Sequence, residues 1–149
     1  MVVGGSLLAW HRVRETTADV DSVRRLEQEL KDAAATVGER HGIAPNWLND
    51  SSAAFRPVNL TESDCDVLAN YPRLRVLGAP LRSVFVMKLY AARTRDHADL
   101  RAMWKDCGFA TPQEAADLFH EAYPHLENDP FLASYIATIA DDAARGGVD

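Results

Sequence analysis

The chain has 149 residues, of which 47% are hydrophobic and 26% charged, and its formal net charge is −6. This length and composition favour one ordinary globular domain, and the negative charge argues against a general polyanion binder. No apolar run reaches the ~18 residues of a membrane span and no leader precedes a cleavage site, so we expect a cytoplasmic protein without membrane contact.

The opening stretch is a short apolar run that breaks at Gly4-Gly5-Ser6 and continues with helix-forming residues over 7–14. This pattern predicts a strand that turns into a helix N-terminus, where free backbone N–H groups and the helix dipole attract an anion. Glycine lets the backbone approach such a group closely, and the Ser6 hydroxyl adds a donor.

Asp19 and Asp21 stand two residues apart in a β-favouring run, and we expect a strand over 18–22. Residues i and i+2 of a strand point to the same face, roughly 6–7 Å apart. Two carboxylates at that separation can share a hard cation such as Mg²⁺ or Mn²⁺, which prefers oxygen ligands. The alternative is a pair of solvated acids at a strand end. Arg12, Arg14, Arg24 and Arg25 flank the pair and provide either local nucleic-acid contacts or a solvated basic surface.

A long helix is predicted next, capped by Asp21 or Ser22, running to about His41 and stopped by Gly42. Apolar residues recur in it at three- and four-residue spacing, which predicts one buried face made of Val23, Leu26, Leu30, Ala33, Ala34 and Val37.

Residues 43–65 are rich in turn formers, so we expect turns and short extended pieces there. Trp47 either packs in the core or lines a pocket and stacks on a base. Two β-favouring runs, 66–69 and 74–77, flank Asn70-Tyr71-Pro72-Arg73 and predict a hairpin. Cys65 and Cys107 lack metal-ligand spacing and are predicted to be reduced thiols.

From Leu81 onward the pattern is helical, with helices predicted over 81–92 and 97–107, the second stopped by Gly108. Thr111-Pro112-Gln113-Glu114 predicts a helix start with a capping box, and that helix ends at Pro124. The last helix opens at Asp129-Pro130 and is followed by a frayed tail over 146–149. Its predicted buried stripe consists of Phe131, Tyr135, Ile136, Ile139 and Ala143.

Lys88 is the only charge between Val84 and Ala92. A helix that is apolar on nearly all sides is buried, and a buried ammonium needs an anionic partner. The alternative is a side chain that reaches water at the helix edge. Asp96 and Asp99 suit the cap and first turn of the next helix, and Asp99 is also a candidate partner for Lys88.

Gly-Gly-Ser followed after twelve residues by Asp-x-Asp resembles the signature of the polymerase-β-like nucleotidyltransferase superfamily. Residues 87–100 resemble the "lysine, then Arg-Asp-x-x-Asp-Leu" segment of small bacterial nucleotidyltransferase-like proteins. These include uncharacterised families, which residues 45–50 also resemble, and the AbiEii-type toxins of toxin–antitoxin and phage-defence systems. The resemblance covers roughly the first hundred residues.

The resemblance implies an α+β fold in which a small mixed sheet of nucleotidyltransferase type packs on helices. Residues 1–80 form the sheet-containing core of one domain and residues 81–149 its helical part. The implied activity is Mg²⁺-dependent transfer of a nucleotidyl group from an NTP to a hydroxyl on RNA, a protein or a small molecule. In the implied site, the nucleotide is bound by Gly4, Gly5, Ser6 and Lys88, and the metal by Asp19 and Asp21. The implied catalytic residues are Asp19, Asp21, Lys88 and Asp99.

Two departures from the family pattern keep a second interpretation open. Family members usually carry a helix ahead of the first strand, so we expect either that an upstream part is missing or that a second subunit, as in a homodimer, protects that strand. Two-metal members also bring a third carboxylate, which is missing from residues 73–79 and for which Asp66 could substitute. The alternative is therefore a catalytically inactive nucleotidyltransferase-fold module that binds a partner.

Overall fold

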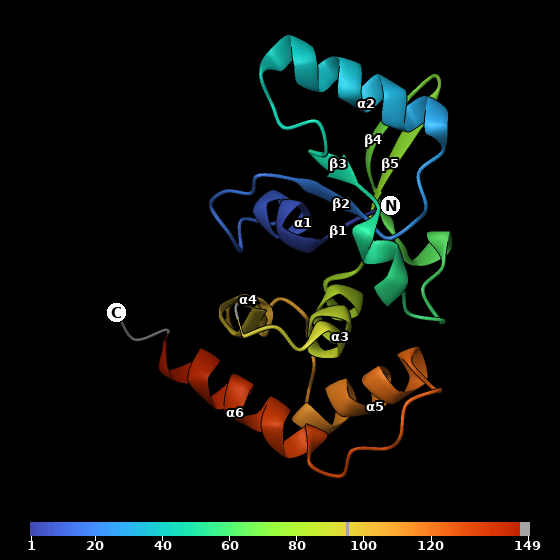
Figure 1. Ribbon diagram of the computed structural model, residues 1–149. Helices are drawn as coiled ribbons and strands as arrows, with labels where there is room; N and C mark the ends of the chain where they lie inside the picture. Colours follow the sequence, from blue (N-terminus) through green and yellow to red (C-terminus); the bar gives the residue numbers. More distant parts are fainter. Residues whose placement is uncertain (95, 147–149) are drawn as a thin grey trace. The chain divides into compact units, whose positions relative to one another are not determined.

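The computed structural model describes residues 1–94 and 96–146 of an α+β protein (Figure 1). A five-stranded mixed sheet and six helices make up the fold, which is about 50% helical and has a helical C-terminal half, so the predicted fold class is confirmed. The chain divides into two compact units. We call residues 1–56 and 62–79 the sheet unit, and residues 57–61 and 80–149 the helical unit. That the two units together form one domain stays a prediction.

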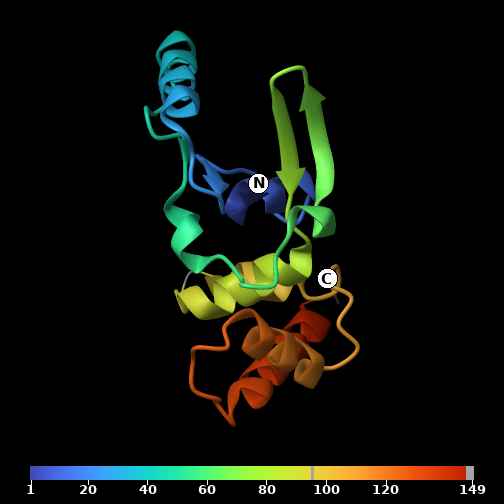
Figure 2. The same cartoon turned by 90° about the vertical axis from the view of Figure 1, so that its right-hand side faces the viewer.

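The sheet of the sheet unit has the strand order β3-β2-β1-β5-β4. Strand β1 runs parallel to β5 and antiparallel to β2, and β3 runs parallel to β2. Strands β4 and β5 form the predicted hairpin (Figure 2). The central strand is β1, so the glycines that follow it lie at the end of the central strand. The strands are β1 (Val2–Val3), β2 (Val20–Ser22), β3 (Leu48–Asn49), β4 (Asp66–Tyr71) and β5 (Leu74–Gly78).

Helix α1 (Gly4–Trp10) begins directly after β1, three residues before the predicted start. This is feasible because Gly4 adopts a positive φ of 67°, which glycine tolerates at little cost. Leu7 and Leu8 are fully buried, and Leu7 packs so closely on β5 that a Cβ at Gly78 would lie 2.9 Å from its Cδ1. Helix α1 is therefore seated tightly on the sheet.

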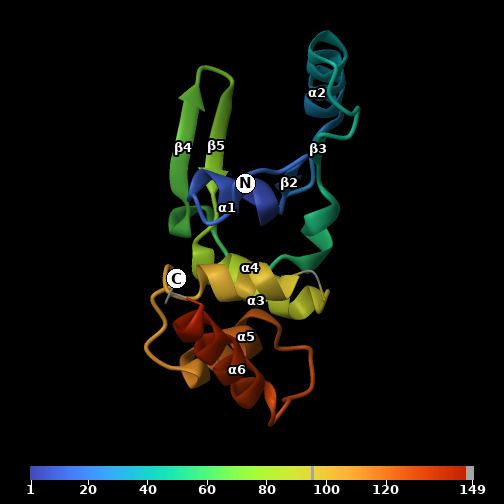
Figure 3. The same ribbon diagram turned by 90° about the vertical axis from the view of Figure 1, so that its left-hand side faces the viewer.

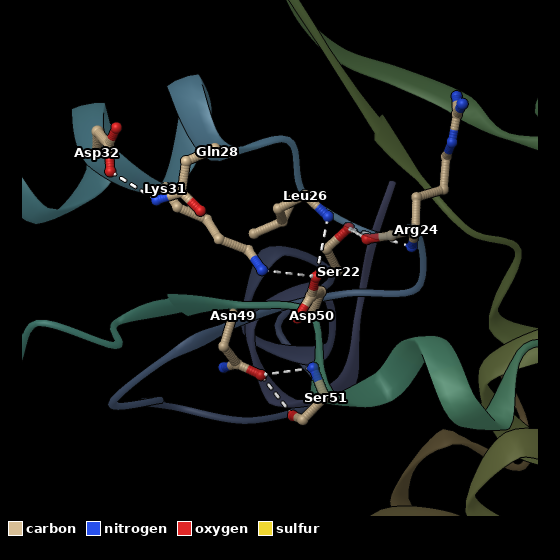
Figure 4. Close-up of polar contacts among 9 residues, drawn as sticks. All are labelled: Ser22, Arg24, Leu26, Gln28, Lys31, Asp32, Asn49, Asp50 and Ser51. Atoms are coloured by element: carbon tan, nitrogen blue, oxygen red, sulfur yellow. Dashed lines mark hydrogen bonds and ion pairs between the residues drawn. The ribbon is translucent and has the colours of Figure 1, made fainter.

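Helix α2 (Gln28–His41) begins later than predicted, although Gly42 ends it as expected with a φ of 64°. The Ser22 hydroxyl forms a local turn in which it accepts from the Arg24 N–H at 3.2 Å and donates to the Arg24 carbonyl at 2.8 Å (Figure 4). The Leu26 N–H donates to the Asp50 carboxylate at 2.9 Å. These contacts compete with helix formation, so the predicted cap at Asp21 or Ser22 is wrong.

The predicted apolar face of α2 is only partly covered. Of the helical residues, Ala34 and Gly38 are buried, whereas Val37 is 40% exposed. The Trp47 indole N–H donates to the Ala34 carbonyl at 2.8 Å, so this ring packs on α2. Two short 3₁₀ helices, η1 (Ser51–Phe55) and η2 (Glu62–Asp64), complete the turn-rich stretch.

Asp50 gives the sheet unit a specific dependence on pH. The Leu26 N–H, together with Lys31 at 3.3 Å, holds the pKa of the Asp50 carboxyl below its ordinary value. A lowered folded-state pKa contributes stability above the unfolded-state pKa of about 3.9, and this contribution is lost as pH falls through the folded-state value. We therefore expect Asp50→Asn to be less stable than the wild type at pH 7, with the difference lost as the pH falls through the lowered folded-state pKa of Asp50. Urea unfolding across this range, with Asp32→Asn as the surface control, measures it.

The helical unit consists of α3 (Leu81–Ala91), α4 (Asp96–Met103), α5 (Pro112–Ala122) and α6 (Leu132–Arg145) (Figure 3). Helix α5 starts as predicted, with the Thr111 hydroxyl accepting from the Glu114 N–H at 3.1 Å. The Glu114 carboxylate accepts from the Ala110 N–H at 2.8 Å and pairs with Arg82, so it does not close the box on the Thr111 amide. Helix α4 is shorter than predicted.

The buried stripe of α6 differs from the prediction at its N-terminal end. Leu132 and Ile136 are buried, whereas Phe131 and Tyr135 are 75% and 47% exposed. The helix begins at Leu132, so the residue four positions later on the inward face is Ile136, and the predicted burial of the two aromatics is wrong. The prediction of a frayed tail falls mostly on 147–149, outside the described residues. No described helix combines the length and the apolar composition needed to cross a membrane.

Candidate functional site

Gly4 and Asp21 lie side by side where β1 ends and α1 begins. Asp21 pairs with Val3 across the antiparallel strands, which brings its side chain beside the residue after Val3. A Cβ at position 4 would overlap the Asp21 Oδ2 atom, so the carboxylate lies directly against the Gly4 backbone. The N-terminal end of a helix favours a negative group, and here the chain supplies a carboxylate of its own.

Asp19 reaches the same junction through a threonine that the sequence reasoning missed. The Thr17 hydroxyl lies 3.1 Å from the Asp19 carbonyl and 3.2 Å from its Oδ1 atom, both of which can accept its proton. A Cβ at Gly5 would lie 2.9 Å from the Thr17 Oγ1 atom and 3.2 Å from the Arg14 Nη1 atom. A hydroxyl two residues before an acid is a local turn signal that could have pointed to Thr17. We call Gly4, Gly5, Asp19 and Asp21 the glycine–acid corner.

The donor chemistry of the glycine–acid corner suits magnesium. Asp19 is exposed and Asp21 is half-buried. Within residues 1–94 and 96–146, no group of three or more His, Cys, Asp or Glu residues gathers to hold a metal. Magnesium is commonly bound through one or two carboxylates while water and substrate phosphates complete its shell, so two carboxylates fit this ion.

Ser6, the predicted phosphate donor, has a different partner in this structure. Its hydroxyl donates to the Val3 carbonyl at 3.1 Å. This bond ties the first turn of α1 to β1. A role for Ser6 on a phosphate stays a prediction.

Asp66 does not join the two acids. It pairs with Gly78 of β5, which in turn is in register with Val2 of β1, so β5 and β1 separate Asp66 from β2. Three strand spacings of about 4.8 Å give roughly 14 Å between β4 and β2. The strand that does neighbour β2 on its other side is β3, where Asn49 is in register with Asp21.

Lys88 forms a buried charge cluster in the helical unit. Its ammonium lies 2.8 Å from an oxygen of Asp96 and 2.8 Å from an oxygen of Asp99. The three side chains are only 11%, 9% and 18% exposed, in that order. The prediction that Lys88 needs an anionic partner is confirmed, and a side chain that escapes to water is not observed.

Asp96 is a second acidic partner of Lys88, in addition to the predicted candidate Asp99. Asp96 was expected to cap α4, but α4 begins at Asp96 itself, and its buried carboxylate binds Lys88 as closely as that of Asp99 does. The cluster holds one positive and two negative groups, so it joins α3 to α4 and the lysine charge is already compensated. That Lys88 and Asp99 act on the same nucleotide as Asp19 and Asp21 stays a prediction.

The two cysteines carry no nucleophilic site. Neither forms a disulfide, as predicted, and Cys107 is buried while Cys65 is half-buried. Burial raises the pKa of the Cys107 thiol to about 12 and raises that of Cys65 as well. Nucleophilic cysteines need a lowered pKa, so neither thiol is activated.

No protein-family model, no curated protein and no solved structure matches this chain. The function proposed below therefore rests on the residues of the chain itself.

Proposed function

We propose that this chain is a nucleotidyltransferase that transfers a nucleotidyl group from an NTP, with Mg²⁺ or Mn²⁺, to a hydroxyl on RNA, a protein or a small molecule. A place in a toxin–antitoxin or phage-defence system is part of the proposal. The observation that carries it is the glycine–acid corner, where the Asp21 carboxylate lies against Gly4 and the Thr17 hydroxyl, which contacts Asp19, lies beside Gly5. The residues of the corner belong to the two sequence motifs that resemble the superfamily signature.

The chemistry of the corner follows from charge. A triphosphate placed at Gly4 and Gly5 would be repelled by the carboxylates of Asp19 and Asp21. These two carboxylates would hold a divalent cation, which would supply the positive charge needed to offset the repulsion and the charge that develops on the α-phosphate. Arg14, close to Gly5, adds a positive group. The acceptor hydroxyl oxygen forms the new bond to the α-phosphorus, the bond to the β-phosphate oxygen breaks, pyrophosphate leaves, and the hydroxyl proton passes to solvent.

The residues outside the corner have supporting roles in this proposal. The roles of Lys88 at the triphosphate, of Asp99 in orienting Lys88 and of Ser6 on a phosphate oxygen stay predictions from the family resemblance. For Lys88 to contact the triphosphate, the nucleotide must compete with the two carboxylates that already hold its ammonium.

Titration calorimetry with ATP, CTP, GTP and UTP, with and without Mg²⁺, tests the proposal. We expect binding that needs the metal and that weakens at least tenfold in Asp19→Ala, because a charge-assisted ligand of the cation is lost. Asp32→Ala, which removes an exposed acid of α2, is the matched control and should bind as the wild type does. Incorporation of a labelled nucleotide into RNA or protein then tests transfer. Binding that ignores the metal, or no binding, contradicts the proposal.

A second candidate is a nucleotide- or partner-binding module without catalysis. Two observations favour it, namely the Lys88 charge compensated by Asp96 and Asp99, and the Ser6 hydroxyl bound to the Val3 carbonyl. This module would bind an NTP or a partner and release no pyrophosphate. Pyrophosphate release in the presence of RNA or protein acceptors separates the two candidates.

A further inference from the structure

Asn49 is the side chain next to Asp21 on the strand that flanks it. Strands β2 and β3 run parallel, with Asp21 in register with Asn49, while Val3 lies on the other side of Asp21. Residues in register on neighbouring strands share a face of the sheet and lie about 4.8 Å apart. Asn49 therefore lies beside Asp21 on the side opposite β1.

The amide group of Asn49 has a fixed orientation. Its Oδ1 atom accepts from the Ser51 N–H at 3.0 Å and also from the Ser51 hydroxyl (Figure 4). These two bonds occupy both lone pairs of the oxygen and identify the other atom as the NH₂ group, which carries two donors. Among residues 1–94 and 96–146 this Nδ2 atom has no hydrogen-bond partner, and it is not enclosed away from solvent.

The neighbouring Asp50 differs from Asn49 in that its polar group has structural partners within the sheet unit. Its carboxylate accepts from the Leu26 N–H at 2.9 Å and lies 3.3 Å from the Lys31 ammonium, so it anchors the start of α2 (Figure 4). Asn49 has its structural bonds through the oxygen alone. The two bonds to Ser51 therefore fix the orientation of the Asn49 NH₂ group, whose donors are available to an acceptor outside the described residues.

We propose that the Asn49 amide donates a hydrogen bond to a phosphate oxygen of the nucleotide held at Asp19 and Asp21. This inference rests on the proposed function. The ligand atom must be an acceptor because an N–H group cannot coordinate a cation and the Oδ1 lone pairs are already occupied. Next to two carboxylates that hold a cation, the acceptor that arrives with that cation is a phosphate oxygen.

The test is Asn49→Asp, which keeps the acceptor for Ser51, retains the size of the side chain and removes the donor. We expect at least a tenfold loss of affinity for the Mg²⁺–NTP complex, because a hydrogen bond to a charged group is lost and a negative group replaces it. Affinity for Mn²⁺ alone, measured by paramagnetic resonance, should stay equal or rise. Asn46→Asp adds the same charge at an exposed nearby position and should bind the nucleotide as the wild type does.

The outcomes separate this inference from the proposed function. If Asp19→Ala loses metal-dependent NTP binding while Asn49→Asp keeps it, the role of Asn49 is wrong and the function stands. If Asn49→Asp weakens Mn²⁺ binding in proportion to NTP binding, Asn49 acts on the cation site and the inference is again overturned. If the wild type binds no NTP, both proposals fail. Circular dichroism of each variant confirms that the fold is retained.

Discussion

Replacing Lys88 by methionine is expected to lower the free energy of unfolding of the helical unit by about 3–5 kcal/mol, the usual cost of removing one partner from a buried ion pair. The Lys88 side chain is 11% exposed, and its removal leaves the Asp96 and Asp99 carboxylates close together in a nearly dry site. The penalty comes from these uncompensated charges rather than from the lost side-chain packing. Hydrogen exchange of the α3 amides measures the change within the helical unit.

Two variants identify the source of this loss. Lys105→Met removes an exposed lysine after α4 and should change the stability by less than about 0.5 kcal/mol. The triple variant Lys88→Met, Asp96→Leu and Asp99→Leu removes every charge of the cluster and should recover most of the stability, because apolar groups can replace a buried ion cluster. If the single variant loses less than about 1 kcal/mol, the cluster is not the buried ion pair described above.

The elements that the sequence predicts best are those with local signals. The hairpin was predictable from Asn70-Tyr71-Pro72-Arg73, of which Pro72 and Arg73 form the turn while Asn70 and Tyr71 complete β4. The start of α5 was predictable from Thr111-Pro112. The need of Lys88 for an acid was also predictable from its apolar surroundings. In each case the residues that determine the local structure lie within a short stretch of the chain.

The elements that the sequence does not predict depend on distant contacts. The start of α2 moves because Asp50, 24 residues away, accepts from the Leu26 N–H. The place of Asn49 beside Asp21 follows from the register of β2 and β3, which no local pattern encodes. Asp66 was a plausible third acid by residue type alone, and only the strand order shows that two strands lie between it and β2.

Gly4→Ala is expected to disturb both the fold and the candidate site. Gly4 has a φ of 67°, which costs an L-residue about 1–2 kcal/mol. The added methyl group would also overlap the Asp21 Oδ2 atom, so the carboxylate must leave its place at the start of α1. We expect a total loss of about 2–4 kcal/mol in the free energy of unfolding, from backbone strain plus the displaced contact. Urea unfolding measures the loss, and calorimetry should show weaker Mg²⁺–NTP binding.

Comparison of Gly4→Ala with Gly42→Ala distinguishes the cost of backbone strain from the cost of the overlap with Asp21. Gly42 has nearly the same φ, 64°, but a Cβ there meets nothing within 4 Å, so this variant should lose only the strain of about 1–2 kcal/mol. A double-mutant cycle makes the comparison direct. Gly4→Ala combined with Asp21→Ala should lose less stability than the sum of the two single variants, because the overlap with the carboxylate is removed and only a 3.3 Å contact with the Cβ of residue 21 remains. If the losses add, Asp21 is not held against Gly4, and the geometry on which the nucleotide site depends is absent.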